Sequence, residues 1–139
     1  MTNFERAFAV VVGIEGGYVN NPADPGGETK FGLSKRANPD LDIKNLTIGM
    51  AQDRYRTRYW NAHNLDSLEY GKALLVFDTA VNGGNHERWY GMYGGCPLPD
   101  FVVNYQAEHN LYLTSLPTWQ TFGRGWSRRL ITLALEALK

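Results

Sequence analysis

The sequence predicts a mainly helical α+β domain with about five or six helices and one small β-hairpin lobe. Apolar residues recur at helical spacing in several segments, and a single dense run of turn-forming residues, 20–27, is flanked by residues suited to short strands. A chain of 139 residues, 43% of them hydrophobic, is large enough to bury one substantial core. We therefore expect one domain over residues 1–139.

The first helix is expected over residues 3–15. Thr2 followed three residues later by Glu5 is a capping-box pattern. Gly16 and Gly17 are expected to stop the helix, because glycine adopts the left-handed closing conformation without strain. The residues at inward-facing helical positions are Phe4, Phe8, Val11 and Glu15.

The turn-rich run allows irregular loop or tight hairpin structure. Tyr18 and Val19 precede it, and Thr29 and Phe31 follow it, so these flanks are expected to form two short strands. Residues 34–45 contain Pro39 and two aspartates, which favour a loop or a short helix broken before the proline.

Four further helices are expected from apolar periodicity. Thr47 caps a helix over residues 47–60, and residues 71–81 form a buried helix with a narrow polar edge at Asp78 and Thr79. Residues 99–112 form the next helix, and residues 124–138 close the chain with Trp126, Leu130, Leu133 and Leu135 inward. The segment 85–98 is polar and glycine-rich, and we expect a loop or a shortened joint there.

Composition excludes several classes of protein. Fourteen basic and fourteen acidic residues give no overall attraction to nucleic acid, although arginines cluster at 54–58 and 124–129. Cys96 is the single cysteine, so an intramolecular disulfide and a multi-cysteine metal site are excluded. No apolar run reaches transmembrane length, and no signal-peptide pattern is present at the N-terminus.

Glu15 is the first candidate for chemistry. A carboxyl on the apolar stripe at the end of a helix is desolvated and faces the negative end of the helix dipole, and both effects raise its pKa. Such a group is suited to protonating a glycosidic oxygen. The alternative is an exposed residue in the last helical turn.

Asp24 is the second candidate. It lies in the proline- and glycine-rich loop, where a solvated carboxylate can face Glu15 as base or charge stabiliser. The alternative is an ordinary turn starter before Pro25 and Gly26. Glu28, in the same loop, is expected to face solvent.

Residues 15–33, from Glu-Gly-Gly-Tyr to Lys-Phe-Gly-Leu, closely resemble the signature of glycoside hydrolase family 108, the N-acetylmuramidases of phage endolysins and bacterial relatives. The resemblance continues through 77–84, and residues 125–129 resemble the end of the peptidoglycan-binding half that usually follows. It implies a lysozyme-like fold with a catalytic half, 1–84, and a shortened C-terminal half, 85–139.

The resemblance also implies residue roles. The signature glutamate falls on Glu15 as catalytic acid, while Asp24 and Thr29 match the aspartate and threonine that hold the attacking water in phage-type lysozymes. Four residues separate Asp24 from Thr29, where the phage-type pattern has five.

The candidates for binding sugar are Tyr18, Phe31, Trp60 and Asn82. Sugar rings present apolar faces that stack on aromatic side chains. For Trp60, as for Trp119 and Trp126, a place in the core is an equal alternative. Adjacent His86 and Glu87 lack further spaced ligands, so no metal and no cofactor is expected.

The predicted function is hydrolysis of the β-1,4 bonds of bacterial peptidoglycan by a monomeric lysozyme, with no nucleic-acid partner. If phage-encoded, the protein is expected in the host cytoplasm or the virion, acting on the wall from the periplasmic side. A lytic transglycosylase, a non-catalytic wall-binding relative and a nucleic-acid binder relying on the arginine clusters remain as alternatives.

Overall fold

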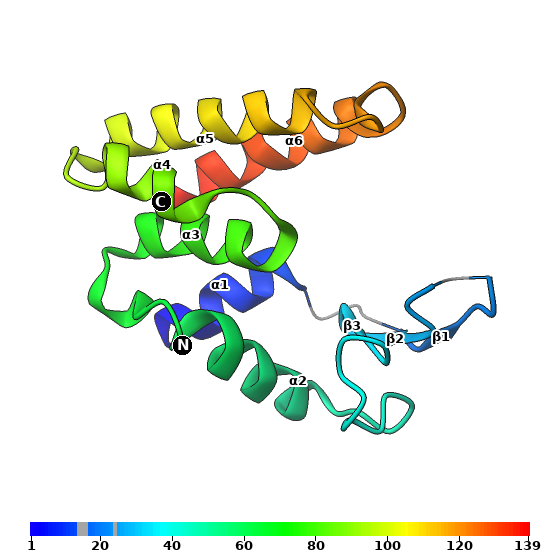
Figure 1. Ribbon diagram of the computed structural model, residues 1–139. Helices are drawn as coiled ribbons and strands as arrows, with labels where there is room; N and C mark the ends of the chain where they lie inside the picture. Colours follow the sequence, from blue (N-terminus) through cyan, green and yellow to red (C-terminus); the bar gives the residue numbers. More distant parts are fainter. Residues whose placement is uncertain (14–16, 24) are drawn as a thin grey trace. The chain divides into compact units, whose positions relative to one another are not determined.

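The computed structural model describes residues 1–13, 17–23 and 25–139, which form two compact units, Met1–Ala62 and His63–Lys139. The predicted mainly helical α+β class is confirmed, since helices dominate and the strands form one small antiparallel sheet (Figure 1). Among the helices of the described residues, none is long and apolar enough to cross a membrane. The boundary between the units lies at 62/63, whereas the expected halves divide at residue 84.

Helix α1 (Asn3–Val11) begins as predicted but ends early. Thr2 Oγ1 accepts a hydrogen bond from the Glu5 backbone nitrogen at 3.1 Å, and the Glu5 carboxylate accepts one from the Thr2 nitrogen at 3.0 Å. Gly13 has φ of 79°, and its nitrogen donates to the Phe8 carbonyl at 3.1 Å. A left-handed glycine closes a helix, so the prediction that this helix reaches residue 15 is wrong.

The sheet has three strands, β1 (Val19–Asn20), β2 (Glu28–Lys30) and β3 (Leu33–Ser34), in the order β1-β2-β3. Both pairings are antiparallel, and Thr29 lies opposite Val19 on one side and Ser34 on the other. The two expected strands are present, but β3 was not predicted. A strand of two residues is too short to show an alternating pattern.

Helix α2 (Ile48–Tyr55) continues into a π-helical turn, η1 (Arg56–Trp60). Thr47 caps it as predicted, with Oγ1 accepting from the Met50 nitrogen at 3.2 Å. The aromatic core of the first unit joins this helix to α1. Two of its ring pairs are Phe4–Trp60, with centroids 5.5 Å apart, and Phe8–Tyr55, at 5.6 Å.

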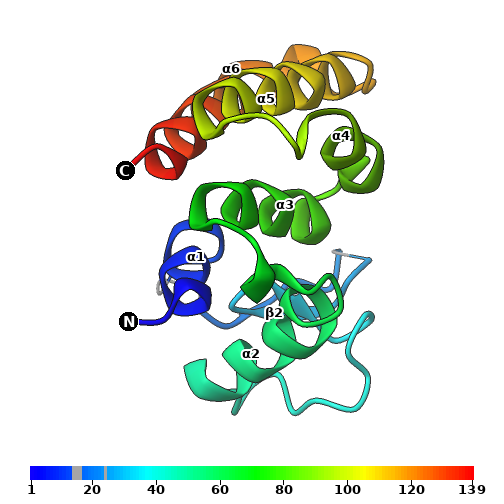
Figure 2. The ribbon, with the colours of Figure 1, turned by 90° about the vertical axis from the view of Figure 1, so that its left-hand side faces the viewer.

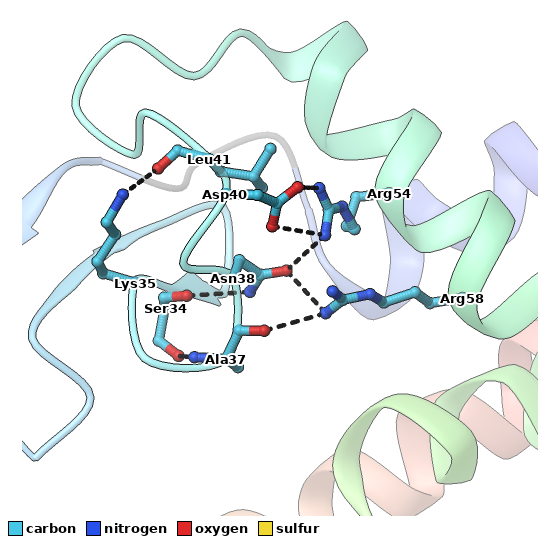
Figure 3. A network of polar contacts seen from close by, with 8 residues as sticks. All are labelled: Ser34, Lys35, Ala37, Asn38, Asp40, Leu41, Arg54 and Arg58. Atoms are coloured by element: carbon cyan, nitrogen blue, oxygen red, sulfur yellow. Dashed lines mark hydrogen bonds and ion pairs between the residues drawn. The ribbon is translucent and has the colours of Figure 1, made fainter.

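Residues 35–47 form an irregular loop, one of the two expected alternatives. Figure 3 shows how this loop is bonded to α2 and η1: Arg54 pairs with Asp40 at 2.5 Å, and Arg58 donates to Asn38 Oδ1 at 2.8 Å and to the Ala37 carbonyl at 3.2 Å. Asn38 is only 2% exposed. Two of the clustered arginines therefore have intramolecular partners that a nucleic-acid phosphate would have to replace.

The second unit begins with a short 3₁₀ helix, η2 (Leu65–Ser67), followed by α3 (Tyr70–Asn82), α4 (His86–Tyr93), α5 (Leu98–Thr114) and α6 (Trp119–Ala137). Helices α5 and α6 lie side by side, and α3 packs against both (Figures 1 and 2). At Gly71, an added Cβ would overlap the Ala137 carbonyl oxygen. Glycine therefore permits the close approach of α3 to the end of α6.

The expected polar edge of α3 is buried. Asp78 and Thr79 are each 1% exposed, and the Thr79 hydroxyl lies 2.5 Å from Tyr105 Oη. Buried polar groups need such partners, and these come from α5 and α6. The prediction of a buried helix is confirmed, and its polar edge at Asp78 and Thr79 is covered as well.

Two predictions for the C-terminal segments also need correction. Residues 86–93 form α4, capped by Asn85 Oδ1, which accepts from the Arg88 nitrogen at 3.2 Å, where a loop or joint was expected. Helix α6 begins at Trp119 rather than residue 124, and Leu135, expected to face inward, is 62% exposed. Leu130 and Leu133 are buried as predicted.

Candidate functional site

The two predicted catalytic carboxylates, Glu15 and Asp24, lie outside the described residues, so their roles remain predictions. Helix α1 ends at Val11. The prediction for Glu15 therefore relies on the sequence signature around it.

Tyr18 lies immediately before β1, and its polar neighbours are Glu28 on β2 and Asn20 on β1. Asn20 and Glu28 are paired across the strands, so the three side chains share one face of the sheet. Partial desolvation and the neighbouring Glu28 carboxylate raise the pKa of Tyr18. The phenol therefore stays neutral and can donate to a carboxylate or a sugar oxygen.

Glu28 is a residue whose position was predicted wrongly. It is half-buried beside Tyr18 rather than facing open solvent. The strand register places it there, and a register depends on turn geometry that a single sequence does not show.

Thr29, the predicted water-holding residue, belongs to the opposite face of the sheet from Tyr18 and Glu28. Side chains alternate along a strand, and Thr29 is paired with Val19 and Ser34. Its hydroxyl donates to the Gly27 carbonyl at 3.4 Å, a long bond. The structure thus places Tyr18 and Thr29 on one sheet but on different faces of it.

Phe31 is held in an unusual backbone conformation next to this sheet. Phe31 and Gly32 have φ of 50° and 75° and join Lys30 to Leu33, the arrangement of a type I′ hairpin turn. The Phe31 carbonyl accepts a hydrogen bond from Tyr55 Oη at 2.8 Å. A bulky residue with positive φ is strained and often marks a functional position. Its half-buried ring remains a candidate for sugar contact.

Trp60 is not available to bind sugar in this structure. Its side chain is 1% exposed and its ring packs edge-on against Phe4. The prediction of Trp60 as a substrate-binding residue is therefore wrong, and its alternative, a place in the core, holds.

Asn82 belongs to the second unit, where it is the last residue of α3 and is exposed. Its Nδ2 donates to Asp78 Oδ1 at 3.0 Å, and Arg129 from α6 donates to the same oxygen at 2.5 Å. The exposed amide is thus anchored to the buried Asp78 carboxylate, which also pairs with the partly exposed Arg129.

His86 lies against His63, with ring centroids 4.4 Å apart, and burial lowers the pKa of His86. Within the described part of the chain, no group of three or more His, Cys, Asp or Glu side chains is arranged to hold a metal ion. Cys96 is partly exposed, with a free thiol.

Comparison with known families identifies the chain. The model of the glycosyl hydrolase 108 family matches residues 8–84, more than half of the sequence. The chain belongs to the glycosyl hydrolase 108 family. The matched range includes Glu15, Asp24 and Thr29, as well as the whole sheet and α2. The family assignment makes the protein a glycoside hydrolase of the peptidoglycan-degrading kind.

Among solved structures, the chain is similar to SagA of Brucella abortus. The two share 26% sequence identity with a TM-score of 0.80, over 97% of this chain and 93% of that one. The similarity therefore includes the C-terminal helices that lie beyond the family match. No curated protein matches the chain.

Proposed function

We propose that this protein is an N-acetylmuramidase that hydrolyses the β-1,4 bond between N-acetylmuramic acid and N-acetylglucosamine in peptidoglycan. The family match over residues 8–84, which contains the Glu-Gly-Gly-Tyr signature, is the observation that carries the proposal. Glu15 acts as the acid that protonates the leaving oxygen. Asp24 activates water or stabilises the positive charge that develops at the anomeric carbon.

The described part of the site supports this chemistry in two ways. Tyr18 offers a neutral phenol beside Glu28 that can contact a sugar hydroxyl or ring face. Thr29 uses its hydroxyl hydrogen on the Gly27 carbonyl, which leaves the oxygen lone pairs able to accept a hydrogen bond from water.

The experiment compares wild type, Glu15→Gln and a matched control, Glu87→Gln, in which an exposed α4 carboxyl is changed in the same way. We expect wild type and the control to clear a suspension of purified peptidoglycan, and Glu15→Gln to keep its circular dichroism spectrum but lose at least a hundredfold in rate. Full activity in Glu15→Gln would remove Glu15 from the mechanism. A wild-type protein that gives no clearing and no zymogram band would indicate a non-catalytic relative.

Mass spectrometry of the released muropeptides identifies the reaction. A hydrolase adds water and leaves a reducing muramic acid. A lytic transglycosylase closes an anhydro ring and gives products lighter by one water. We expect the reducing products, and anhydro products would assign the chain to the second reaction.

We also propose a role in lysis from inside the cell, as for a phage enzyme. Wild-type protein expressed in the cytoplasm should lyse cells only after the membrane is permeabilised, and Glu15→Gln should not lyse them at all. Lysis without permeabilisation, or by both forms equally, would contradict this role.

A further inference from the structure

We propose that Asn82, held in place by Asp78 and Arg129, forms with the adjacent hollow of the second unit a binding subsite for an acetamido sugar. The proposal rests on the proposed function, since it takes peptidoglycan glycan as the ligand. The three residues come from two helices: Asp78 and Asn82 from α3, and Arg129 from α6.

The buried Asp78 carboxylate, paired with the partly exposed Arg129, fixes the orientation of the Asn82 side-chain amide. Asp78 is 1% exposed, and its Oδ1 accepts from Arg129 Nη1 at 2.5 Å and from Asn82 Nδ2 at 3.0 Å. A carboxylate accepts hydrogen bonds and does not donate them, so the NH₂ group of Asn82 must face it. The amide oxygen, Oδ1, is consequently directed away from Asp78. No other described residue makes a hydrogen bond to it.

A neutral histidine preserves this arrangement. His109 Nδ1 lies 3.9 Å from Asp78 Oδ2, beyond hydrogen-bond distance, and both atoms are buried without a hydrogen-bond partner in the described structure. Burial lowers the pKa of His109, the nearby Asp78 carboxylate opposes that shift, and Arg129 adds to it. Near neutral pH the imidazole is therefore uncharged and does not compete with Arg129 for Asp78.

The hollow beside Asn82 has a volume of about 210 Å³. Its walls combine aromatic, aliphatic and polar side chains, among them Tyr112, Leu113, Leu116, Trp126, Arg129 and Leu130. Ligand pockets are commonly about 300–1,000 Å³, so this one accommodates a single ring or a small substituent rather than an extended ligand.

The chemistry of these walls defines the ligand. Asn82 Oδ1 requires a hydrogen-bond donor, the Trp126 and Tyr112 rings favour an apolar ring face, and the leucines favour a methyl group. A 2-acetamido sugar carries all three features, as its amide N–H, the C–H face of its ring and its acetyl methyl group. Glucose has the ring face but lacks the acetamido group.

The test is NMR on the full-length Glu15→Gln variant, which leaves the glycan uncut. N-acetylglucosamine is the probe and glucose the control ligand. We expect N-acetylglucosamine to shift the Asn82 side-chain NH₂ and Trp126 indole resonances, and glucose not to shift them. The indole of Trp60, buried in the other unit, serves as the reference and should not move.

Variants separate a positioning role from a general structural one. Asn82→Ala should weaken the binding measured at the Trp126 indole by about 3- to 10-fold, as expected for one lost hydrogen bond. Arg129→Met should weaken it similarly, because Asp78 loses its cation and the hollow loses a polar side chain. Arg129→Lys, which keeps a cation near Asp78, should restore much of the affinity. Unchanged affinity in Asn82→Ala, or no Trp126 shift with N-acetylglucosamine, would overturn the proposal.

Failure of the subsite and failure of the proposed function give different results. A wild type that cleaves peptidoglycan while Glu15→Gln gives no Trp126 shift would refute the subsite alone. A Trp126 shift in a protein whose wild type releases no muropeptides would refute the enzymatic assignment alone.

Discussion

Gly32→Ala tests how the hairpin that carries Thr29 and Phe31 is attached to the rest of its unit. A Cβ at this position would lie 2.5 Å from Tyr55 Oη, the atom that donates to the Phe31 carbonyl at 2.8 Å. Alanine would therefore force the phenol away and break that bond. Gly32 also has φ of 75°, which disfavours any side chain there.

A matched variant separates the cost of the left-handed backbone conformation from the cost of displacing Tyr55. The left-handed conformation costs alanine about 1–2 kcal/mol, and this cost applies equally to Gly27→Ala, where φ is 72° and an added Cβ meets nothing within 4 Å. Displacing Tyr55 adds about 1–3 kcal/mol through overpacking and the lost hydrogen bond. We expect Gly32→Ala to lower the free energy of unfolding by about 2–5 kcal/mol in total.

Urea unfolding of both variants, in wild type and in a Tyr55→Phe background, measures the coupling between the residue at position 32 and the Tyr55 hydroxyl. Without the hydroxyl the next Tyr55 atom is 3.9 Å from the Cβ position, an ordinary contact. The difference between Gly32→Ala and Gly27→Ala should then fall to within about 0.5 kcal/mol. The attachment of the hairpin through Tyr55 would be refuted if both variants lowered the free energy of unfolding equally in wild type. It would also be refuted if their difference persisted in Tyr55→Phe, because the Tyr55 hydroxyl would then not attach the hairpin.

Three further outcomes are expected. Trp60→Ala should destabilise the protein by about 3–5 kcal/mol in urea unfolding; a loss below about 1 kcal/mol would contradict its core position. Gly71→Ala should cost about 1–3 kcal/mol or more through overlap with the Ala137 carbonyl, while Gly91→Ala, on open helix surface, should be neutral or stabilising by thermal unfolding. Because burial lowers the pKa of His109, the unfolded chain binds the proton more readily, so the free energy of unfolding should fall as pH drops below about 6.5. Urea titrations should show a weaker fall in His109→Gln, and an identical slope would exclude this histidine.

The sequence predicted those helices whose boundaries and buried faces depend on local pattern. The expected segments 71–81 and 99–112 differ from α3 and α5 by only one or two residues at each end, because apolar spacing and flanking glycine or proline residues define them. The end of α1 was missed because Gly13, Gly16 and Gly17 are all able to close a helix. Which of them does so depends on the tertiary structure.

The sequence predicted which residues belong to the candidate site better than it predicted how they are arranged. Tyr18 and Thr29 could be named from the signature, but their opposite faces follow from the strand register. Asp78 was expected at a polar edge, since a lone aspartate gives no sign that an arginine 51 positions later will pair with it. Such pairing between distant segments is a property of the folded chain.

The position of α3 limits how this enzyme can be divided. The family match ends at residue 84, just after α3, but α3 packs against α5 and α6, and its residues 73–79 are buried. A fragment cut at residue 84 would expose that apolar helix together with an unpaired Asp78 carboxylate. Domain exchange between enzymes of this family, or trimming to a minimal catalytic fragment, should therefore join chains near residue 62, where the compact units meet in sequence, and keep residues 63–139 as one piece.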